Sequence, residues 1–134
     1  MIISDIIGGW RLKSMQWVSR TGVYKSPFGN EPQGILTYTK NHIMNVIIVA
    51  SEEINDTDLP IGRYIAYAGT YKISDDHIIH EVKVATLDRL INSQEKRYYS
   101  LTPNDQLILS SDWWHTDDET EWRANAIVWE KNYI

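Results

Sequence analysis

Tyr71 and His80 are the two residues of this sequence whose types and spacing could do chemistry together. They belong to the segment Tyr64–Ala85, in which two β-rich runs flank the polar turn Ser74–His77, and this pattern predicts a β-hairpin. If the hairpin closes symmetrically, Tyr71 pairs with His80 and both side chains lie on one face. A phenol and an imidazole that share a hydrogen bond there could move a proton on an apolar ligand, because free histidine titrates near neutrality. The alternative, which we favour, is that His80 is a buried, hydrogen-bonded structural residue.

The symmetrical register extends along the whole hairpin. It pairs Ile73 with Ile78, Gly69 with Val82, and Tyr67 with Val84. One face of the hairpin is then aromatic and apolar with a single imidazole, whereas the other face is more polar. We expect the aromatic face to line an interior.

Further polar side chains are candidates for contacts with a ligand in that interior: Tyr38, Tyr67, Arg97 and Tyr99. Arg97 and Tyr99 share a face, and a buried guanidinium would need an anionic partner or a ligand carboxylate. The alternative is an Arg97 on the surface and tyrosines that serve as ordinary strand residues. The facing of the hairpin 95–111 depends on its loop length, which the sequence leaves open.

Two tryptophans occupy the first and last predicted strands, which pair if the sheet closes. Trp129 could stack on a flat hydrophobic ligand, and we include it among the ligand-binding candidates. Trp10 fits core packing better.

One acidic segment carries side chains that could ligate a metal ion: Asp112, His115, Asp117 and Asp118. The segment lacks the glycine and the ligand spacing of a calcium loop, so we predict a solvated turn and no metal site. The sequence has no cysteine, which excludes thiol chemistry and disulfides. It also has no phosphate-binding glycine loop, serine-hydrolase elbow or zinc-protease motif, and we predict no cofactor.

The length of 134 residues suits a single domain over 1–134. About eight strands are predicted, at residues 10–18, 34–39, 42–50, 64–73, 78–85, 95–102, 106–111 and 123–131. Short hairpins without a long helix indicate an all-β fold, an antiparallel up-and-down barrel or a sandwich. A barrel of eight strands encloses side chains or one small ligand.

Charge and hydropathy limit the partners. The net charge is −5, so nucleic acid and anionic membrane surfaces are poor partners. No apolar run approaches the ~20 residues that a membrane helix needs, and the first residues lack a leader pattern. We therefore expect a cytoplasmic protein.

Three segments invite structural hypotheses. Met1–Ile7 is apolar enough to plug one end of a barrel, and Ser51–Gly62 could form a lid over an opening. His42–Ala50 is apolar on both faces, which indicates that it is covered on both sides and suggests a homodimer contact.

Four stretches of the chain match a known pattern in the right order: GGWRLKSM, YKSPFGNEPQGILTYT, RYIAYAGTYKI with IIHEVKVA, and IVWEK. They resemble the small bacterial and fungal lipocalin-like domain family, with its G-x-W-x-L opening strand and its Tyr-x-Gly-Thr-Tyr segment. The resemblance implies a calycin-type antiparallel barrel with a central cavity. Family members occur as separate domains and near secondary-metabolite pathways, and the resemblance supplies no catalytic motif.

Three functions follow as hypotheses. The first is binding of a small hydrophobic molecule in an aromatic-lined cavity. The second is a cofactor-independent cyclase or isomerase acting on a polyketide- or terpenoid-like intermediate, with His80 and Tyr71 as its catalytic residues. The third is an interaction module with a filled interior.

Overall fold

The computed structural model describes residues 3–52, 62–114 and 124–131 of the chain. In these ranges the chain forms two short 3₁₀ turns, η1 (Ile3–Asp5) and η3 (Asp88–Leu90), and nine strands. The strands are β1 (Gly8–Ser19), β2 (Gly22–Lys25), β3 (Gln33–Tyr38), β4 (Ile43–Val49), β5 (Tyr64–Ile73), β6 (His77–Ala85), β7 (Gln94–Leu101), β8 (Gln106–Ser110) and β9 (Ala124–Lys131).

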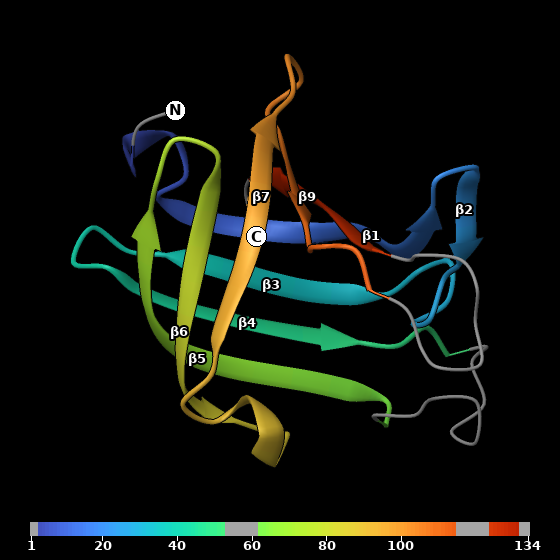
Figure 1. The fold of residues 1–134 in the computed structure, drawn as a ribbon, viewed down its shortest axis with the longest axis horizontal. Coiled ribbons are helices and arrows are strands. Elements are labelled where there is room, and N and C mark those ends of the chain that lie inside the picture. The colour runs from blue at the N-terminus through green and yellow to red at the C-terminus, as the bar shows by residue number, and fades with distance from the viewer. Residues whose placement is uncertain (1–2, 53–61, 115–123, 132–134) are drawn as a thin grey trace.

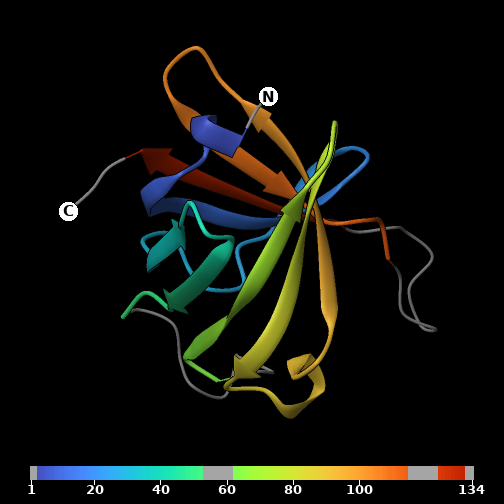
Figure 2. The same cartoon turned by 90° about the vertical axis from the view of Figure 1, so that its left-hand side faces the viewer.

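Eight of the strands form a closed antiparallel barrel (Figures 1 and 2). From β3 to β9 each strand pairs with the next one along the chain, β1 pairs with β3, and β9 returns to pair with β1. The short strand β2 is additional and pairs only with the end of β1, where Trp17 lies opposite Lys25. The predicted all-β antiparallel barrel is therefore confirmed. The short strand β2 was not among the predicted strands.

The central hairpin pairs as predicted near its turn and differs at its far end. Tyr71 lies opposite His80, and Gly69 lies opposite Val82. The register then shifts, so that Tyr67 faces Ala85 and not Val84. Lys83 is the extra residue of a β-bulge, which rotates the chain and leaves the Val84 side chain exposed.

The backbones approach closely at this bulge. A Cβ atom added to Gly69 would lie 1.9 Å from the carbonyl oxygen of Glu81. No side chain fits at that distance, so glycine is required at position 69 for steric reasons.

A second bulge occurs in β1 and changes which residues face inward. Leu12 pairs with Trp129 and Ser14 pairs with Val128, which leaves Lys13 unpaired in the ladder to β9. The inward face therefore passes from Leu12 to Met15 and Trp17, whereas strict alternation would have placed Ser14 there.

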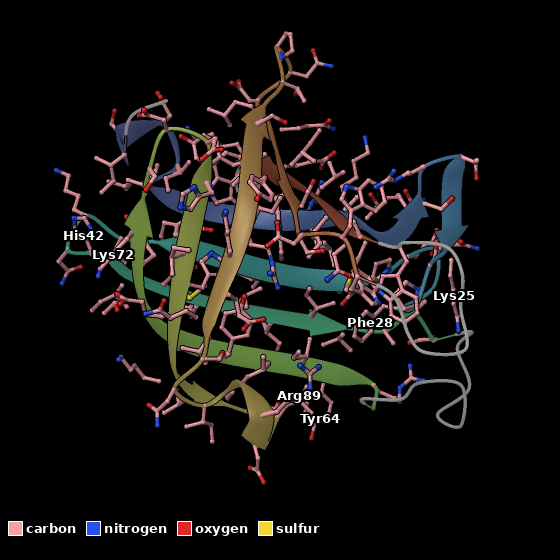
Figure 3. All side chains as sticks on the ribbon, viewed as in Figure 1. Lys25, Phe28, His42, Tyr64, Lys72 and Arg89 are labelled. Atoms are coloured by element: carbon pink, nitrogen blue, oxygen red, sulfur yellow. The ribbon has the colours of Figure 1, made fainter. Side chains whose placement is uncertain are left out.

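One end of the barrel is filled by side chains. The buried residues of that end are Ile6, Trp10, Tyr38, Met44, Tyr71 and Ile78. Ile6 lies just after η1, is fully buried, and its carbonyl accepts a hydrogen bond of 2.8 Å from Nε1 of Trp10, so the described residues 3–6 of this segment pack against that end. Figure 3 shows His42 and Lys72 at this end, and Phe28 toward the opposite end.

The outer face of β3 and β4 is apolar and exposed within the single chain. Ile35, Ile43, Ile47 and Val49 are each between 38 and 45% exposed. That a second subunit covers this outer face of β3 and β4 stays a prediction. In the described part of the chain, no helix has the length and the apolar character that crossing a bilayer requires. The predicted lid at Ser51–Gly62 falls largely on residues 53–61, outside the described residues.

Candidate ligand-binding cavity

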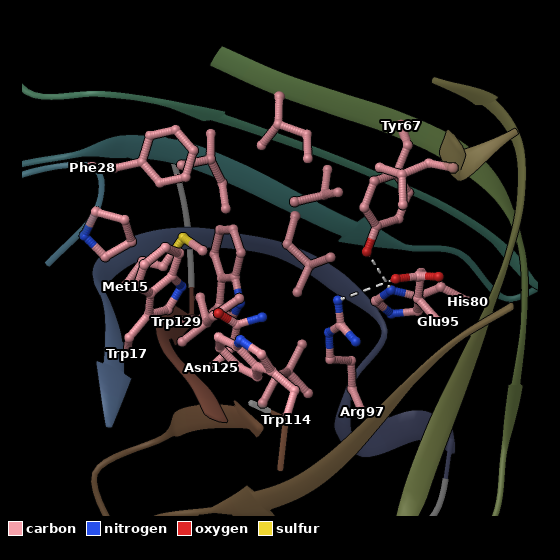
Figure 4. A pocket seen from close by; sticks show the side chains of 18 of the residues that line it. Met15, Trp17, Phe28, Tyr67, His80, Glu95, Arg97, Trp114, Asn125 and Trp129 are labelled. Carbon is pink, nitrogen blue, oxygen red and sulfur yellow. Dashed lines mark hydrogen bonds and ion pairs between the residues drawn. The ribbon is translucent and has the colours of Figure 1, made fainter. Parts of the chain in front are cut away.

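The half of the barrel beyond the filled end contains a cavity of about 450 Å³. Its apolar wall includes Met15, Trp17, Phe28, Leu36, Val46, Ile48, Leu109, Trp114 and Ile127. Its polar groups include those of Tyr67, His80, Glu95, Arg97, Asn125 and Trp129 (Figure 4), and Arg89 of η3 also lines it. A concave and mostly apolar site with a few convergent polar groups is the usual form of a small-molecule site.

Aromatic rings form one side of the cavity. Trp17 of β1 and Trp114 meet edge to face, with ring centroids 5.9 Å apart and an interplanar angle of 84°. Phe28, from the loop between β2 and β3, is fully buried and lies on the same side in Figure 4. These rings supply a large apolar surface with few rotatable bonds, which suits a flat or ring-containing ligand.

His80 closes the inner end of the cavity through a hydrogen-bond network. Its Nε2 lies 2.6 Å from the hydroxyl of Tyr38, and its Nδ1 lies 2.8 Å from the hydroxyl of Tyr67. A neutral imidazole has one donor and one acceptor, so one tyrosine donates to the ring and the other accepts from it. The hydrogen bond that the catalytic alternative needs between His80 and Tyr71 is replaced by other bonds: the Tyr71 hydroxyl donates to the carbonyl oxygen of Thr39, at 2.6 Å.

Burial determines the protonation of this network. Burial, and after it the nearby Arg97, lower the pKa of His80 to about 3. Burial also raises the pKa of Tyr67 to about 12 and that of Tyr38 well above its usual value. All three groups are therefore neutral at physiological pH, and both ring nitrogens of His80 are engaged. This is the geometry of the structural histidine that we favoured.

Arg97 projects into the cavity from β7, and its side chain is only 15% exposed. Its Nη2 lies 3.8 Å from Oε1 of Glu95, and its Nη1 donates to the carbonyl of Lys96 at 2.9 Å. The anionic partner expected for a buried guanidinium is thus present in the chain itself. The two charges compensate each other, so the inner wall carries little net charge.

The predicted ligand-binding residues divide into two groups. Tyr67, His80, Arg97 and Trp129 line the cavity. The others, Tyr38, Tyr71 and Tyr99, do not: Tyr38 and Tyr71 lie in the filled end, and the Tyr99 hydroxyl donates to the carbonyls of Ser74 and Asp75 at the β5–β6 turn.

Other lining residues were missed by the sequence analysis. Met15 and Trp17 were missed because the bulge at Lys13 reverses their facing. Phe28 and Trp114 lie outside the paired strands, where no alternation predicts direction. Asn125 could have been found, because it shares a strand face with Ile127 and Trp129 by simple alternation.

Three of the four metal-ligand candidates of the acidic segment fall outside the structure's described ranges. They are His115, Asp117 and Asp118. Among the described residues, no group of three or more potential ligands is placed to hold a metal ion.

Comparison with known proteins gives one finding. The model of a family described as a lipocalin-like domain matches residues 52–132, which include β5 to β9. A search among curated proteins found no match.

Proposed function

The chain belongs to the lipocalin-like domain family, and from this premise we propose that it binds a small hydrophobic molecule in the cavity of its barrel. The observation that carries the proposal is the division of the interior. One end is packed with side chains, whereas the other end holds about 450 Å³ of space behind aromatic walls. Cores are normally packed to high density, so a cavity of this size needs an occupant.

The wall residues have distinct roles in this proposal. Trp17, Trp114 and Phe28 bury the ligand's apolar surface. Tyr67 and His80, held in place by their mutual hydrogen bond, form a rigid inner end against which the ligand stops. Arg97 and Trp129 complete the polar contacts.

The geometry supports binding better than proton transfer. Catalysis by His80 would need a ring nitrogen that is free to exchange a proton with the substrate near neutral pH. Both nitrogens instead bond to tyrosines, and burial holds the pKa of His80 at about 3. The cyclase or isomerase hypothesis therefore lacks a specific observation in its favour.

Native mass spectrometry of the purified protein, followed by organic extraction, tests for a retained ligand. We expect an added mass that disappears after extraction. The quantitative test is titration with the neutral fluorescent probe N-phenyl-1-naphthylamine, which binds apolar cavities without needing a charge partner.

Two neighbouring substitutions on β4 make a matched pair for this titration. Val46→Trp places an indole inside the cavity, whereas Ile47→Trp places it on the outer face. We expect Val46→Trp to weaken probe binding at least about tenfold and Ile47→Trp to leave it close to that of the unmodified protein. Equal affinities in the two variants would contradict binding in the barrel.

A further inference from the structure

Two polar atoms in the cavity wall are buried and lack a hydrogen-bond partner among the described residues. They are Nε1 of Trp129, whose side chain is 1% exposed, and Oδ1 of Asn125. Both side chains come from the inner face of β9 and line the cavity (Figure 4). Buried polar groups are nearly always hydrogen-bonded, so an unpaired donor and an unpaired acceptor in one cavity need an explanation.

The rest of the interior makes this pair unusual. His80, Tyr38, Tyr67 and Tyr71 all place their polar atoms within 2.8 Å of a partner. In the described part of the chain one further buried atom lacks a partner, Oγ of Ser93, and this residue does not line the cavity. Unsatisfied polar atoms inside the barrel are therefore concentrated on the β9 wall.

The chemistry of the two atoms specifies their complement. An indole nitrogen is only a donor, and an amide oxygen is only an acceptor. A group that satisfies both must accept one hydrogen bond and donate another, as a hydroxyl does. An ionised carboxylate cannot donate, and it would place negative charge against the Asn125 oxygen.

Charge at the inner end of the cavity also favours a neutral group there. The charged side chains that line it are Arg97, Glu95 and Arg89. Arg97 and Glu95 form an ion pair at 3.8 Å, and Arg89 is exposed on η3. Among the described residues, the inner end of the cavity therefore has no cation without a partner, and the one other lining cation, Arg89, lies away from it on η3.

We propose that the ligand is a neutral, ring-containing molecule with a hydroxyl group, such as an alcohol or phenol, which accepts from Trp129 Nε1 and donates to Asn125 Oδ1. This inference rests on the proposed binding function and adds the ligand class and its polar anchor. The aromatic walls bind the apolar body, and the β9 pair distinguishes a hydroxylated compound from its hydrocarbon or ether analogue.

Three probes of one shape test the anchor: naphthalene, 2-methoxynaphthalene and 2-naphthol. Their affinities are measured by quenching of tryptophan fluorescence at a pH well below the titration of the naphthol. The ether can accept but not donate, so it separates the two hydrogen bonds. In the unmodified protein we expect 2-naphthol to bind about tenfold more tightly than naphthalene, with the ether between them.

Variants assign the preference to the two residues. Trp129→Phe removes the donor and keeps an aromatic ring, and Asn125→Leu removes the acceptor at similar volume. We expect Asn125→Leu to abolish the preference for naphthol over the ether, and Trp129→Phe to bring the ether down to the affinity of naphthalene. Trp17→Phe is the matched control, because it removes another indole from the wall that is not one of the buried unpaired donors. It should lower all three affinities alike.

The outcomes separate this inference from the proposed function. If all three probes bind with equal affinity, or if the naphthol preference persists in both β9 variants, the cavity binds ligands but the anchor is refuted. If no probe binds, not even naphthalene, the binding function itself fails and the anchor with it. If Trp129→Phe does not fold, Asn125→Leu still tests whether the ligand hydroxyl donates a hydrogen bond to Asn125.

Discussion

The burial of His80 predicts a specific dependence of stability on pH. The folded state holds the pKa of this residue at about 3, against 6.5 for an unperturbed histidine. Between these values the unfolded chain binds a proton that the folded chain excludes, so the free energy of unfolding falls as the pH falls. The stabilisation is fully present above pH 6.5 and is lost progressively toward pH 3.

The magnitude follows from the two pKa values. Each unit of pKa difference corresponds to about 1.4 kcal/mol, so the full effect is roughly 5 kcal/mol. Between pH 7 and pH 4.5 the imidazole alone should lower the free energy of unfolding by roughly 2 to 3 kcal/mol. This is a large share of the ~5–15 kcal/mol that stabilises a typical domain.

Urea denaturation of the unmodified protein and of His80→Gln, followed by tryptophan fluorescence at several pH values, measures the effect. Other titrating groups contribute to both proteins and cancel in the difference. We expect the stability advantage over His80→Gln to be greatest at pH 7 and to shrink by roughly 2 to 3 kcal/mol at pH 4.5.

Tyr67→Phe serves as the control, because it removes a hydrogen bond to His80 but keeps the ring buried. Since burial is the main cause of the low pKa, this variant should lose stability equally at all pH values and retain the slope. A difference between the unmodified protein and His80→Gln that does not change with pH would refute the reasoning, as would an NMR titration of the His80 ring near pH 6.5.

Three further predictions address the fold and its surface. Gly69→Ala should lower the free energy of unfolding by about 2 kcal/mol or more in urea denaturation, because its Cβ would overlap the Glu81 carbonyl. The control Gly9→Ala should be nearly neutral, because no atom lies within 4 Å of its added Cβ. Equal losses of stability in the two variants would contradict the close approach at Gly69. Tyr71→Phe should cost about 1 kcal/mol by the same measurement, through loss of a partly buried hydrogen bond, and an unchanged stability would show that this bond contributes nothing. We expect light scattering to find a dimer that Ile47→Glu converts to a monomer, and a monomeric unmodified protein would contradict the predicted contact on β4.

The sequence predicts what depends on short-range pairing. The polar turn at Ser74–His77 fixes the register nearby, so the pairing of Tyr71 with His80 could be derived from turn chemistry and alternation alone. The same alternation correctly places Ile127 and Trp129 on the inner face of β9.

The features that the sequence analysis missed depend on single-residue insertions in strands and on contacts across the interior of the barrel. Lys13 and Lys83 carry no signal that marks them as unpaired, yet each reverses the facing of the residues beyond it. One of the two hydrogen-bond partners of His80 could also not be predicted from the sequence, because Tyr38 comes from β3, which is not adjacent to β6 in the sheet. Such a contact arises only when the barrel closes.

Closure of the barrel by β1 and β9 also has a consequence for how the chain folds. The pair brings together residues as distant as Arg11 and Glu130, which are 119 positions apart and hydrogen-bonded at 3.0 Å. Contacts of such long sequence separation slow folding, because the entropy of loop closure is lost before the contacts form. Until β9 docks, both β1 and β8 present open edges that can pair with other chains. A nascent chain therefore stays vulnerable to aggregation until its ninth strand has been synthesised, whatever the stability of the finished barrel.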